Sequence, residues 1–494
     1  MRSMLSALTV VSSLFLSALA VAGQTVGDAR GRAELERLLK RLPEKEFFNE
    51  WLKKSGELPP DFDALPSQFY LSDPLMWDKN GRLQRVARAD WPERRKQLAG
   101  LVEKWLLGTA PPPPGNVVAD ILEKTQDRGH TVLKAQLRFG PNHAAKLNVT
   151  LYLPQDQSRP APIFLCDSER YISWAEGAMA QGFGVAVHGA RDSKDESLAY
   201  ANLFGDYDWS SFRRRGWSAS RVVDWLVTLP FVDAQRIFIG GHSRSAKQAT
   251  AGAIFDERIA GLIASSPGSG GSMPYRYCDQ SYFGESAEQL TSRFPDWVHP
   301  RVRFFCGRED KLPADSHFLY AMMAPRPVFM STATEDQVES TWAIEQVYKS
   351  IKPVYELLGA PQNLAFRYRP GPHPTDAPTA VAFSQFLLAA ARGEPLGELF
   401  PFTPIHPWDY AAWEEKHAPR ESTQSFQSIQ SFPKAKLADP TLDDKGRRMN
   451  AETWRAHRAT IQNRVRWLLG EGPEFGQTPV KFGVKEPEEL PKQL

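Results

Sequence analysis

The order of apolar and polar residues along the chain changes from a helical period to the pattern of a layered α/β protein. Residues 31–54 and 90–108 place apolar residues at helical spacing among many charged ones, which predicts amphipathic helices. The second stretch ends at Gly108 and at the helix-breaking run APPPPG. Beyond that run, residues 131–139 and 147–154 alternate apolar with polar side chains, which predicts two paired strands.

Short apolar segments then alternate with helical ones. Six segments bounded by turn residues have the length and composition of buried strands: APIFLCDS, GFGVAVHGA, RIFIGGHS, GLIASSPGS, RPVFMSTAT and NLAFRYRPG. Helical patterns such as WSASRVVDWLVTL and AIEQVYKSIKPVYELLG lie between the later segments. Strands that alternate with helices predict a mostly parallel sheet covered on both faces. We therefore expect a three-layer α/β sandwich with helical extensions at both ends.

The end of the chain lacks this alternation but repeats part of the beginning. The tail segment DPTLDDKGRRMNAETWRAHRATIQNRVRWLLGEG is similar to DPLMWDKNGRLQRVARADWPERRKQLAGLVEKWLLG near the N-terminus. Both contain Asp-Pro, an Asp-Lys close to Gly-Arg, an early tryptophan and a final Trp-Leu-Leu-Gly. A duplicated helical module explains the likeness, and two unrelated amphipathic helices with similar ends are the alternative.

Composition and charge exclude several classes of protein. The chain has 494 residues, 24% of them charged, and a formal net charge of +2, which is not the balance of a nucleic-acid-binding protein. The basic cluster FRRRGW at residues 212–217 is interpreted as a solvated helix face rather than an anion site. The three cysteines, Cys166, Cys278 and Cys306, cannot form a disulfide framework, and their spacing fits no zinc site.

The N-terminus has the features of a secretory signal peptide. It reads MRSMLSALTVVSSLFLSALAVAGQ, with a basic start, an apolar run and the small residues Ala-Val-Ala before the expected cleavage site. We therefore expect a signal peptide over residues 1–23 and a secreted or periplasmic protein. No later stretch approaches the ~20 apolar residues that a membrane span needs, so we expect no membrane association.

A candidate nucleophile lies within FIGGHSRSAKQAT, residues 238–250. The five residues around Ser243 follow a predicted strand and open a predicted helix, which is the setting of a G-x-S-x-G nucleophile elbow. Small neighbours are needed because the serine adopts a strained backbone conformation. The fifth position is Ser245 rather than glycine, which is still small. A plain strand-to-helix turn is the alternative.

The partners that would activate this serine occur later in the chain, in the order of an α/β-hydrolase triad. Such triads place the acid and then the histidine at the ends of successive strands. RPVFMSTATEDQVES puts Glu335, Asp336 and Glu339 just after a strand, and AFRYRPGPHPTD puts His373 just after the next. The order and placement predict a Ser-acid-His hydrolytic triad.

Residues from about Asp208 to Leu388 resemble the glucuronoyl esterases, α/β-hydrolases that cleave 4-O-methyl-glucuronoyl esters linking lignin to xylan. HSRSAK is similar to the family's elbow Cys-Ser-Arg-Asn-Gly-Lys and keeps its serine, arginine and lysine. FDERIAGLIASSPGSGGSMPYR resembles the family's stretch from FDxRIAL to ESGSGG. FPDWVHPRVRFF, KLPADSHFLYAMMAPRP and KPVYELLG continue the likeness in order. The resemblance implies an α/β-hydrolase fold and a serine esterase.

The resemblance also implies roles for individual residues. Arg244, directly after the nucleophile, matches an arginine that helps to stabilise the oxyanion beside backbone N–H groups. Lys247 matches a lysine that contacts hydroxyl or ether oxygens of the uronate. Glu285, in YFGESAEQL, falls where the family often has a glutamate near the sugar.

The chain departs from the family at three positions. The family's frequent acid in ESGSGG is Ser266 here, so we expect Asp336 to be the triad acid, with Glu339 second and Glu335 third. Val338 and Tyr275 stand where members often have tryptophan. The resemblance thus implies a retained catalytic set beside an altered sugar pocket.

These observations predict a serine carboxylic ester hydrolase that acts on plant polysaccharide esters as a monomer, without metal or cofactor. We expect four regions: a signal peptide (1–23), a helical N-terminal region (24–115), an α/β-hydrolase catalytic domain (116–393) and a C-terminal extension with the helical repeat (394–494). One alternative is an acetylxylan esterase-like carbohydrate deacetylase, which uses the same triad without a carboxylate pocket. The other is a non-catalytic glycan-binding protein on a hydrolase fold. The missing carboxylate at Ser266 and the half-repeated tail argue mildly for it, and the intact set of Ser243, Asp336 and His373 argues against it.

Overall fold

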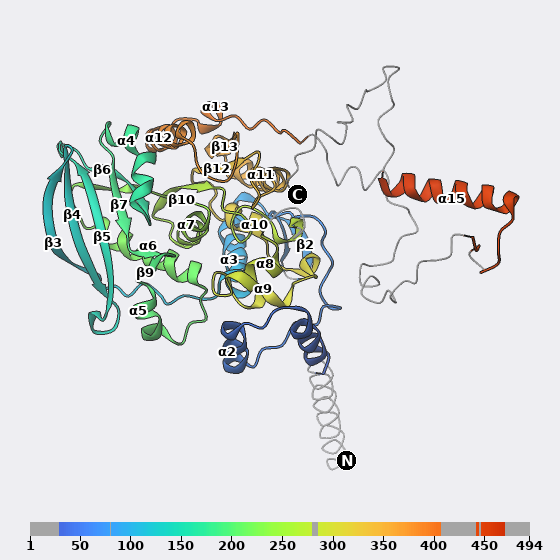
Figure 1. The fold of residues 1–494 in the computed structure, drawn as a ribbon. Coiled ribbons are helices and arrows are strands. Elements are labelled where there is room, and N and C mark those ends of the chain that lie inside the picture. The colour runs from blue at the N-terminus through green and yellow to red at the C-terminus, as the bar shows by residue number, and fades with distance from the viewer. Residues whose placement is uncertain (1–28, 80, 279–284, 407–440, 444–445, 470–494) are drawn as a thin grey trace, which may run out of the picture. The chain divides into compact units, whose positions relative to one another are not determined.

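The computed structural model describes residues 29–79, 81–278, 285–406, 441–443 and 446–469. The chain divides into two compact units, Met1–Trp408 and Asp409–Leu494 (Figure 1). The signal peptide predicted for residues 1–23 lies outside the described residues. Within the described ranges, no helix combines the length and the apolar character that crossing a membrane requires.

The first unit is built on a nine-stranded sheet in the order β13-β12-β11-β10-β6-β7-β5-β4-β3. The six strands from β13 to β7 run parallel, and β5, β4 and β3 extend the sheet antiparallel to their neighbours. The mostly parallel sheet predicted from the alternation of strands and helices is confirmed. The strand bounds are β3 Val118–Asp127, β4 His130–Phe139, β5 Ala145–Pro154, β6 Ala161–Cys166, β7 Gly184–His188, β10 Val232–His242, β11 Ile259–Ser265, β12 Val328–Ala333 and β13 Leu364–Arg369.

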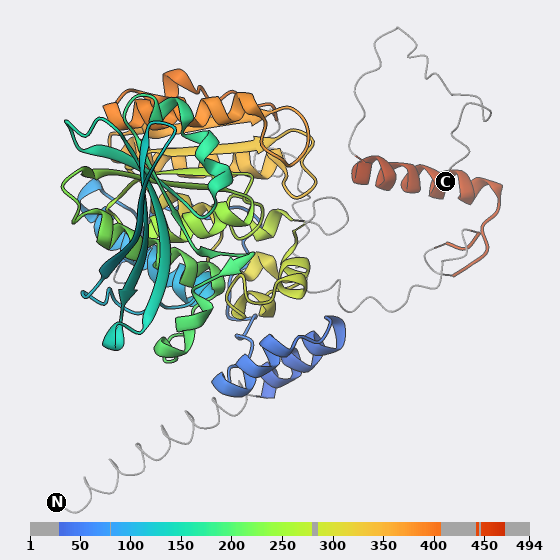
Figure 2. The same cartoon turned by 60° about the vertical axis from the view of Figure 1, so that its left-hand side comes forward.

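Helices cover both faces of this sheet, which gives the three layers of an α/β-hydrolase (Figures 1 and 2). Alternate residues of a strand enter different cores: Ile163 and Leu165 of β6 join one apolar cluster, and Phe164 joins the other. The larger cluster takes in α3 Trp91–Val102, α6 Ser211–Leu226, α7 Arg244–Phe255, α10 Ser316–Ala321 and α11 Thr341–Leu357. The smaller cluster takes in α4 Glu176–Met179 and α12 Ala377–Arg392.

The N-terminal helices belong to the same compact unit as the sheet. A helix over residues 29–41, α2 Glu46–Ser55 and the hairpin β1 Met76–Lys79 with β2 Arg82–Arg85 precede α3. Three apolar side chains of α3, Trp91, Leu98 and Val102, are buried in the larger cluster. Arg95 adds a hydrogen bond from Nε to the Met322 carbonyl at 2.9 Å. This region is therefore packed against the sheet-bearing part rather than separate from it.

The interpretation of FRRRGW as a solvated helix face is wrong. Arg213, Arg214 and Arg215 are all buried in α6. Arg214 and Arg215 both donate to Asp195, at 3.0 and 2.9 Å, and Arg213 donates to Glu103 at 3.1 Å. Their carboxylate partners come from other elements, so the run of arginines by itself could not reveal that the charges are compensated.

The second unit contains a short antiparallel bridge between Leu442 and Arg448, followed by α15 Ala451–Leu469. The hairpin β1-β2 followed by α3 has the same order of elements. Both turns contain a glycine with positive φ, Gly81 at 77° and Gly446 at 72°. The order of elements agrees with the duplicated module expected from the sequence, which remains a prediction.

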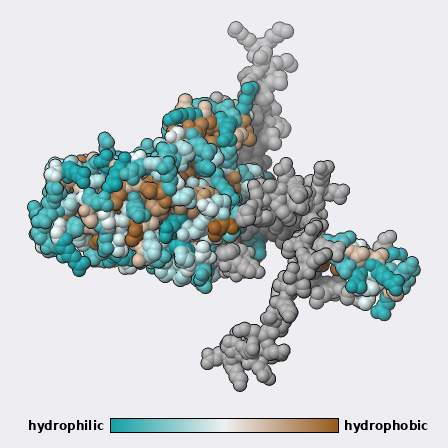
Figure 3. All heavy atoms as spheres, turned by 90° about the horizontal axis from the view of Figure 1, so that it is seen from above, coloured by the Kyte–Doolittle hydropathy of each residue, from teal (hydrophilic) through white to brown (hydrophobic). Residues whose placement is uncertain are grey.

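The surface of the first unit mixes polar and apolar side chains. Figure 3 shows a mostly hydrophilic face on which hydrophobic residues occur in small groups. Scattered exposed apolar residues of this kind are normal for a globular protein.

Candidate active site

The predicted elbow is formed by Ser243, the residue between the end of β10 and the start of α7. Its backbone has φ 57° and ψ −127°, a strained conformation for a non-glycine residue. Gly241 makes this turn possible, because a Cβ there would lie 2.6 Å from the carbonyl carbon of Ser245. The Ser243 N–H donates to the Ser265 carbonyl of β11 at 2.8 Å, which anchors the turn to the sheet. The half-buried serine is thus presented at the carboxyl end of a central strand.

The loops after β12 and β13 bring an aspartate and a histidine together. His373 Nδ1 lies 2.8 Å from Asp336 Oδ2. The Asp336 side chain is fully buried, while 29% of the His373 side chain is exposed. The second oxygen of Asp336 accepts the Val338 N–H at 2.9 Å, which fixes the carboxylate. A carboxylate on Nδ1 leaves Nε2 of the imidazole as the nitrogen that can act on a nucleophile.

His373 lies beside the elbow. The ring of His242, the residue before Ser243, is 4.5 Å from the His373 ring. His242 Nδ1 is also 3.1 Å from Ser265 Oγ and 3.3 Å from Thr375 Oγ1. Burial lowers the pKa of His242 far below its usual range, helped by the neighbouring His373, so His242 is a neutral contact. The hydrogen bonds of the described residues do not join Ser243 Oγ to His373, a contact that often tightens only when substrate binds.

Of the three carboxylates left open by the sequence, Asp336 alone contacts His373 among the described residues. Glu335 is exposed. Glu339 is 1% exposed and accepts hydrogen bonds from the Gly268 N–H at 2.7 Å and from Thr332 Oγ1 at 2.8 Å. Burial, with the nearby charge of Asp336, raises the pKa of Glu339. The geometry therefore favours Asp336 as the triad acid and indicates a structural role for Glu339.

Arg244 is oriented by an aspartate that the sequence did not single out. Its guanidinium Nη1 donates to Asp192 Oδ2, and 48% of its side chain is exposed. The other oxygen of Asp192 accepts from Trp297 Nε1 at 3.1 Å and from Arg215 Nη1 at 3.3 Å. Asp192 lies in the turn between β8 Ala190–Arg191 and β9 Lys194–Asp195, where no motif marks it.

Lys247, one turn into α7, forms an ion pair with the partly buried Glu285. The Lys247 side chain is 1% exposed, and its Nζ donates to Glu285 Oε2 at 2.5 Å. The ammonium lies 5.0 Å from the centroid of the Trp297 ring and 5.9 Å from that of Phe212. Gly268 (φ 67°) leaves room for the carboxylate, because a Cβ there would lie 2.4 Å from Glu285 Oε2. The two residues predicted to bind substrate are therefore brought together.

The two predicted pocket substitutions differ in position. Tyr275 is 1% exposed and belongs to the larger apolar cluster, so its departure from tryptophan changes the core. Val338 is partly exposed in the loop that carries Asp336, and its carbonyl oxygen would lie 3.5 Å from a Cβ added at Gly268. The Val338 main chain thus lies close to Gly268, the glycine beside the Glu285 carboxylate.

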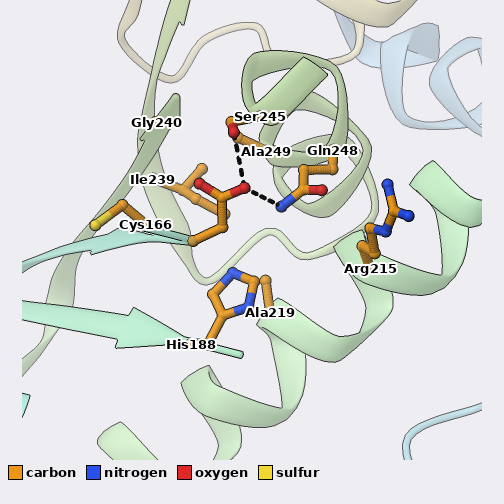
Figure 4. A pocket seen from close by; sticks show the side chains of 10 residues that line it. Cys166, His188, Arg215, Ala219, Ile239, Gly240, Ser245, Gln248 and Ala249 are labelled. Carbon is orange, nitrogen blue, oxygen red and sulfur yellow. Dashed lines mark hydrogen bonds between the residues drawn. The ribbon is translucent and has the colours of Figure 1, made fainter. Parts of the chain in front are cut away.

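Asp167 directly follows β6 and accepts hydrogen bonds from α7. Figure 4 labels the two α7 side chains that donate them, Ser245 and Gln248. Asp167 Oδ2 accepts from Ser245 Oγ at 2.7 Å and from Gln248 Nε2 at 2.8 Å. These residues and His188 line a buried cavity of about 10 Å³. Burial raises the pKa of Asp167. The serine in the fifth position of the elbow, where the general motif has glycine, is the residue that makes this link.

Comparison with known proteins agrees with this geometry. Residues 140–359 match the family model described as glucuronyl esterase of fungi. Carbohydrate esterase MZ0003, from an unknown prokaryotic organism, is 23% identical over 386 residues, which cover 64% of this chain and 88% of that protein. The 4-O-methyl-glucuronoyl methylesterase of Phanerochaete carnosa is 25% identical over 379 residues, which cover 72% of this chain and 90% of that protein.

A solved structure supports the fold. A glucuronoyl esterase variant from Sporotrichum thermophile, in complex with methyl 4-O-methyl-beta-D-glucopyranuronate, superposes with a TM-score of 0.57 at 18% identity. The superposition covers 71% of this chain and 95% of that one. The chain therefore shares the α/β-hydrolase fold of the glucuronoyl esterases and is similar to them in sequence over residues 140–359.

Proposed function

We propose that this chain is a serine carboxylic ester hydrolase that cleaves glucuronoyl esters of plant polysaccharides. The observation that carries the proposal is the His373–Asp336 hydrogen bond of 2.8 Å, placed beside the strained elbow of Ser243. A strained serine next to a histidine oriented by a buried carboxylate is the arrangement that serine hydrolases use. The names of the relatives, which are carbohydrate and glucuronoyl esterases, agree with it.

The proposed reaction proceeds through an acyl-enzyme. Ser243 Oγ attacks the ester carbonyl while His373 Nε2 takes its proton. Asp336 holds the imidazole in the productive tautomer and stabilises its protonated form. Backbone N–H groups at the start of α7 and the guanidinium of Arg244 receive the negative charge that develops on the carbonyl oxygen. His373 then protonates the leaving alcohol and activates the water that releases the acid.

The pair of Lys247 and Glu285 supports a uronate as the acyl part of the substrate. The buried Lys247 ammonium and the partly buried Glu285 carboxylate offer one donor and one acceptor for sugar hydroxyl or ether oxygens. The solved complex of the Sporotrichum thermophile enzyme contains a methyl ester of 4-O-methyl-glucuronate, which is the same class of substrate.

Hydrolysis of benzyl glucuronate, measured beside hydrolysis of an acetylated xylan, tests the proposal. We expect turnover of the glucuronate ester that falls by about 10⁴-fold or more in Ser243→Ala and in His373→Ala. Turnover of the acetyl ester alone would favour the acetylxylan esterase-like alternative. Lack of turnover of both esters, together with binding of the glycan, would favour the non-catalytic alternative.

We also propose the setting in which this enzyme works. The apolar N-terminus supports removal of residues 1–23 as a signal peptide and export of the protein. We propose a helical N-terminal region over 24–115, which belongs to the same compact unit as a catalytic domain over 116–393, and a protein that acts as a monomer. The bridge and helix of the second unit support a repeated N-terminal module within residues 394–494.

A further inference from the structure

One buried tryptophan contacts both halves of the candidate site. Trp297 lies between α8 Ala287–Arg293 and α9 Arg301–Phe304 and is 6% exposed. Its indole N–H donates to Asp192 Oδ1 at 3.1 Å, and its ring lies 5.0 Å from the Lys247 ammonium. Asp192 binds Arg244, the proposed oxyanion donor, and Lys247 belongs to the proposed sugar contact. The indole N–H of Trp297 thus contacts the aspartate that binds Arg244, and the face of the same ring lies near Lys247.

The carboxylate of Asp192 divides its two oxygens between the scaffold and the active site. Oδ1 accepts from Trp297 and from Arg215, which is itself buried and bonded to Asp195. Oδ2 is left to Arg244. The bonds to Oδ1 fix the orientation of the Asp192 carboxylate. The carboxylate in turn positions the Arg244 guanidinium, whose side chain is otherwise half exposed. Loss of the indole bond would leave Arg215 as the one described scaffold donor to Oδ1.

The face of the ring stabilises the buried lysine. A cation near the face of a tryptophan is attracted by the ring's electrons, and the attraction is larger where water is excluded. Lys247 is 1% exposed, so the ring and Glu285 together compensate its desolvated charge. Phenylalanine would keep this interaction in weaker form and lose the N–H.

The tryptophan is itself held firmly. It stacks on Phe294 with ring centroids 3.7 Å apart and an interplanar angle of 6°. Phe212 packs against it with centroids 5.1 Å apart. The Trp297 N–H of the main chain donates to the Phe294 carbonyl at 3.1 Å. These contacts hold the Trp297 ring in place, so that it can position both Asp192 and Lys247.

From these contacts we infer that Trp297 is a positioning residue that sets Arg244 through Asp192 and Lys247 through its ring face. The inference rests on the proposed esterase function. It predicts that the two contacts of the ring affect different kinetic constants. The N–H acts through Arg244 on the transition state and so on kcat, whereas the ring face acts through Lys247 on substrate binding and so on KM.

A double-mutant cycle between Trp297 and Arg244 tests the inference on benzyl glucuronate. Trp297→Phe removes the indole N–H and keeps a ring. We expect kcat to fall about tenfold with KM changed less than twofold, because one hydrogen bond to a charged group is lost. In the Arg244→Ala background the same substitution should change kcat less than twofold, since its route to the oxyanion is gone. Trp297→Leu, which removes the ring, should also raise KM.

Trp91→Phe is the matched control. Trp91 is buried to a similar degree, at 4% exposure, and its indole N–H has no hydrogen-bond partner among the described residues. We expect this variant to keep the wild-type kcat and KM, with the melting temperature of each variant recorded. A tenfold loss of kcat in Trp91→Phe would show a general effect of such substitutions and overturn the inference.

The cycle separates failure of this inference from failure of the proposed function. An active wild type in which Trp297→Phe and Arg244→Ala act additively on kcat overturns the role of Trp297 alone. An effect of Trp297→Phe on KM without an effect on kcat does the same. A wild type without turnover of the glucuronate ester overturns the proposed function and the inference together.

Discussion

Arg369 donates from Nη2 to the Ser266 hydroxyl at 2.8 Å and, from the same atom, to the main-chain carbonyl of His373. Its side chain is fully buried, and the guanidinium lies 3.8 Å from Asp336 Oδ2. Ser266 is the position at which the resembled family frequently has its acid. In this chain the Arg369 guanidinium lies next to that position. It donates to the main chain of the loop that carries His373 and lies near Asp336, the carboxylate bonded to His373. The serine at position 266 is therefore hydrogen-bonded to a buried arginine, which also binds the histidine loop.

This arrangement predicts unequal effects for its two members. Arg369→Met should lower both kcat and the melting temperature, because Asp336 and Glu339 then lose their buried cationic neighbour; breaking a buried charge pair typically destabilises by about 3–5 kcal/mol. Ser266→Ala should change kcat less than about threefold, since Arg369 keeps its bonds to the loop carbonyls. Kinetics and thermal unfolding of both variants check this. A Ser266→Ala enzyme as impaired as Arg369→Met would contradict it.

The acid of the triad is expected to be Asp336. Asp336→Asn keeps the size of the side chain but cannot hold the same tautomer of His373, so kcat should fall by about 10³–10⁴-fold. Glu339→Gln should retain at least a tenth of wild-type kcat, because Glu339 bonds to Gly268, Thr332 and the Ser272 hydroxyl rather than to His373. Steady-state rates of the two variants decide between the carboxylates. A crippled Glu339→Gln enzyme with an active Asp336→Asn enzyme would reverse the assignment.

Glu339 also predicts a pH dependence of stability. Its folded-state pKa is raised above the ordinary value of 4.5 by burial and by Asp336. Above pH 4.5 the unfolded chain therefore releases this proton while the folded chain keeps it, and the free energy of unfolding falls as the pH rises. The slope is at most about 1.4 kcal/mol per pH unit for one proton.

Chemical denaturation at several pH values from about 4.5 upward measures this slope. Glu339→Gln cannot titrate, so its stability should depend less on pH than that of the wild type across this window. Equal slopes for both proteins would show that Glu339 ionises normally in the folded state.

Much of the fold could be predicted from the sequence because its signals are local. The six buried segments and the helices between them predicted the parallel part of the sheet, and Gly241, two residues before Ser243, marked the elbow. The strand ends alone placed Ser243, three candidate carboxylates and His373 in the order of a triad, since parallel strands bring their carboxyl ends to one edge. The choice of Asp336 among the three came from the family resemblance.

The supporting residues could not be predicted, because their signals depend on contacts between distant segments. Asp192 and Trp297 are separated by 105 residues and look like an ordinary turn aspartate and an ordinary core tryptophan. Arg214 and Arg215 have the sequence pattern of solvent-facing charges, because their contacts with Asp195 cannot be read from the sequence. Asp167 follows a buried strand directly, which was a weak signal for a residue at the sheet edge that carries the site.

Arg244 should act on the transition state. The ground-state carbonyl carries little charge, so a guanidinium gains most once the oxyanion has formed. Arg244→Ala should lower kcat by roughly two to three decades with little change in KM. Arg244→Lys should recover part of the loss, since an ammonium lacks the planar fork that Asp192 holds. A normal kcat with a raised KM in Arg244→Ala would move this residue from oxyanion stabilisation to substrate recognition.

Lys247 should distinguish the sugar acid from other acyl groups. Its ammonium is buried against Glu285 and the Trp297 ring, so methionine at this position would keep the packing volume and remove the donor. Lys247→Met should raise KM for benzyl glucuronate by about tenfold or more, the usual size of losing one hydrogen bond to a charged group. It should leave the turnover of a simple acetyl ester within about threefold, because that substrate offers no sugar oxygens to bind.

Glu285→Gln provides the matched control for that substitution. It keeps an acceptor for Lys247 and removes the negative charge, so the ammonium becomes more available to a substrate oxygen but less compensated when the site is empty. We expect a smaller change in KM than in Lys247→Met, with the same indifference toward the acetyl ester. If both variants impair the two esters equally, the pair supports the fold of α7 and the selection of the uronate must lie elsewhere in the site.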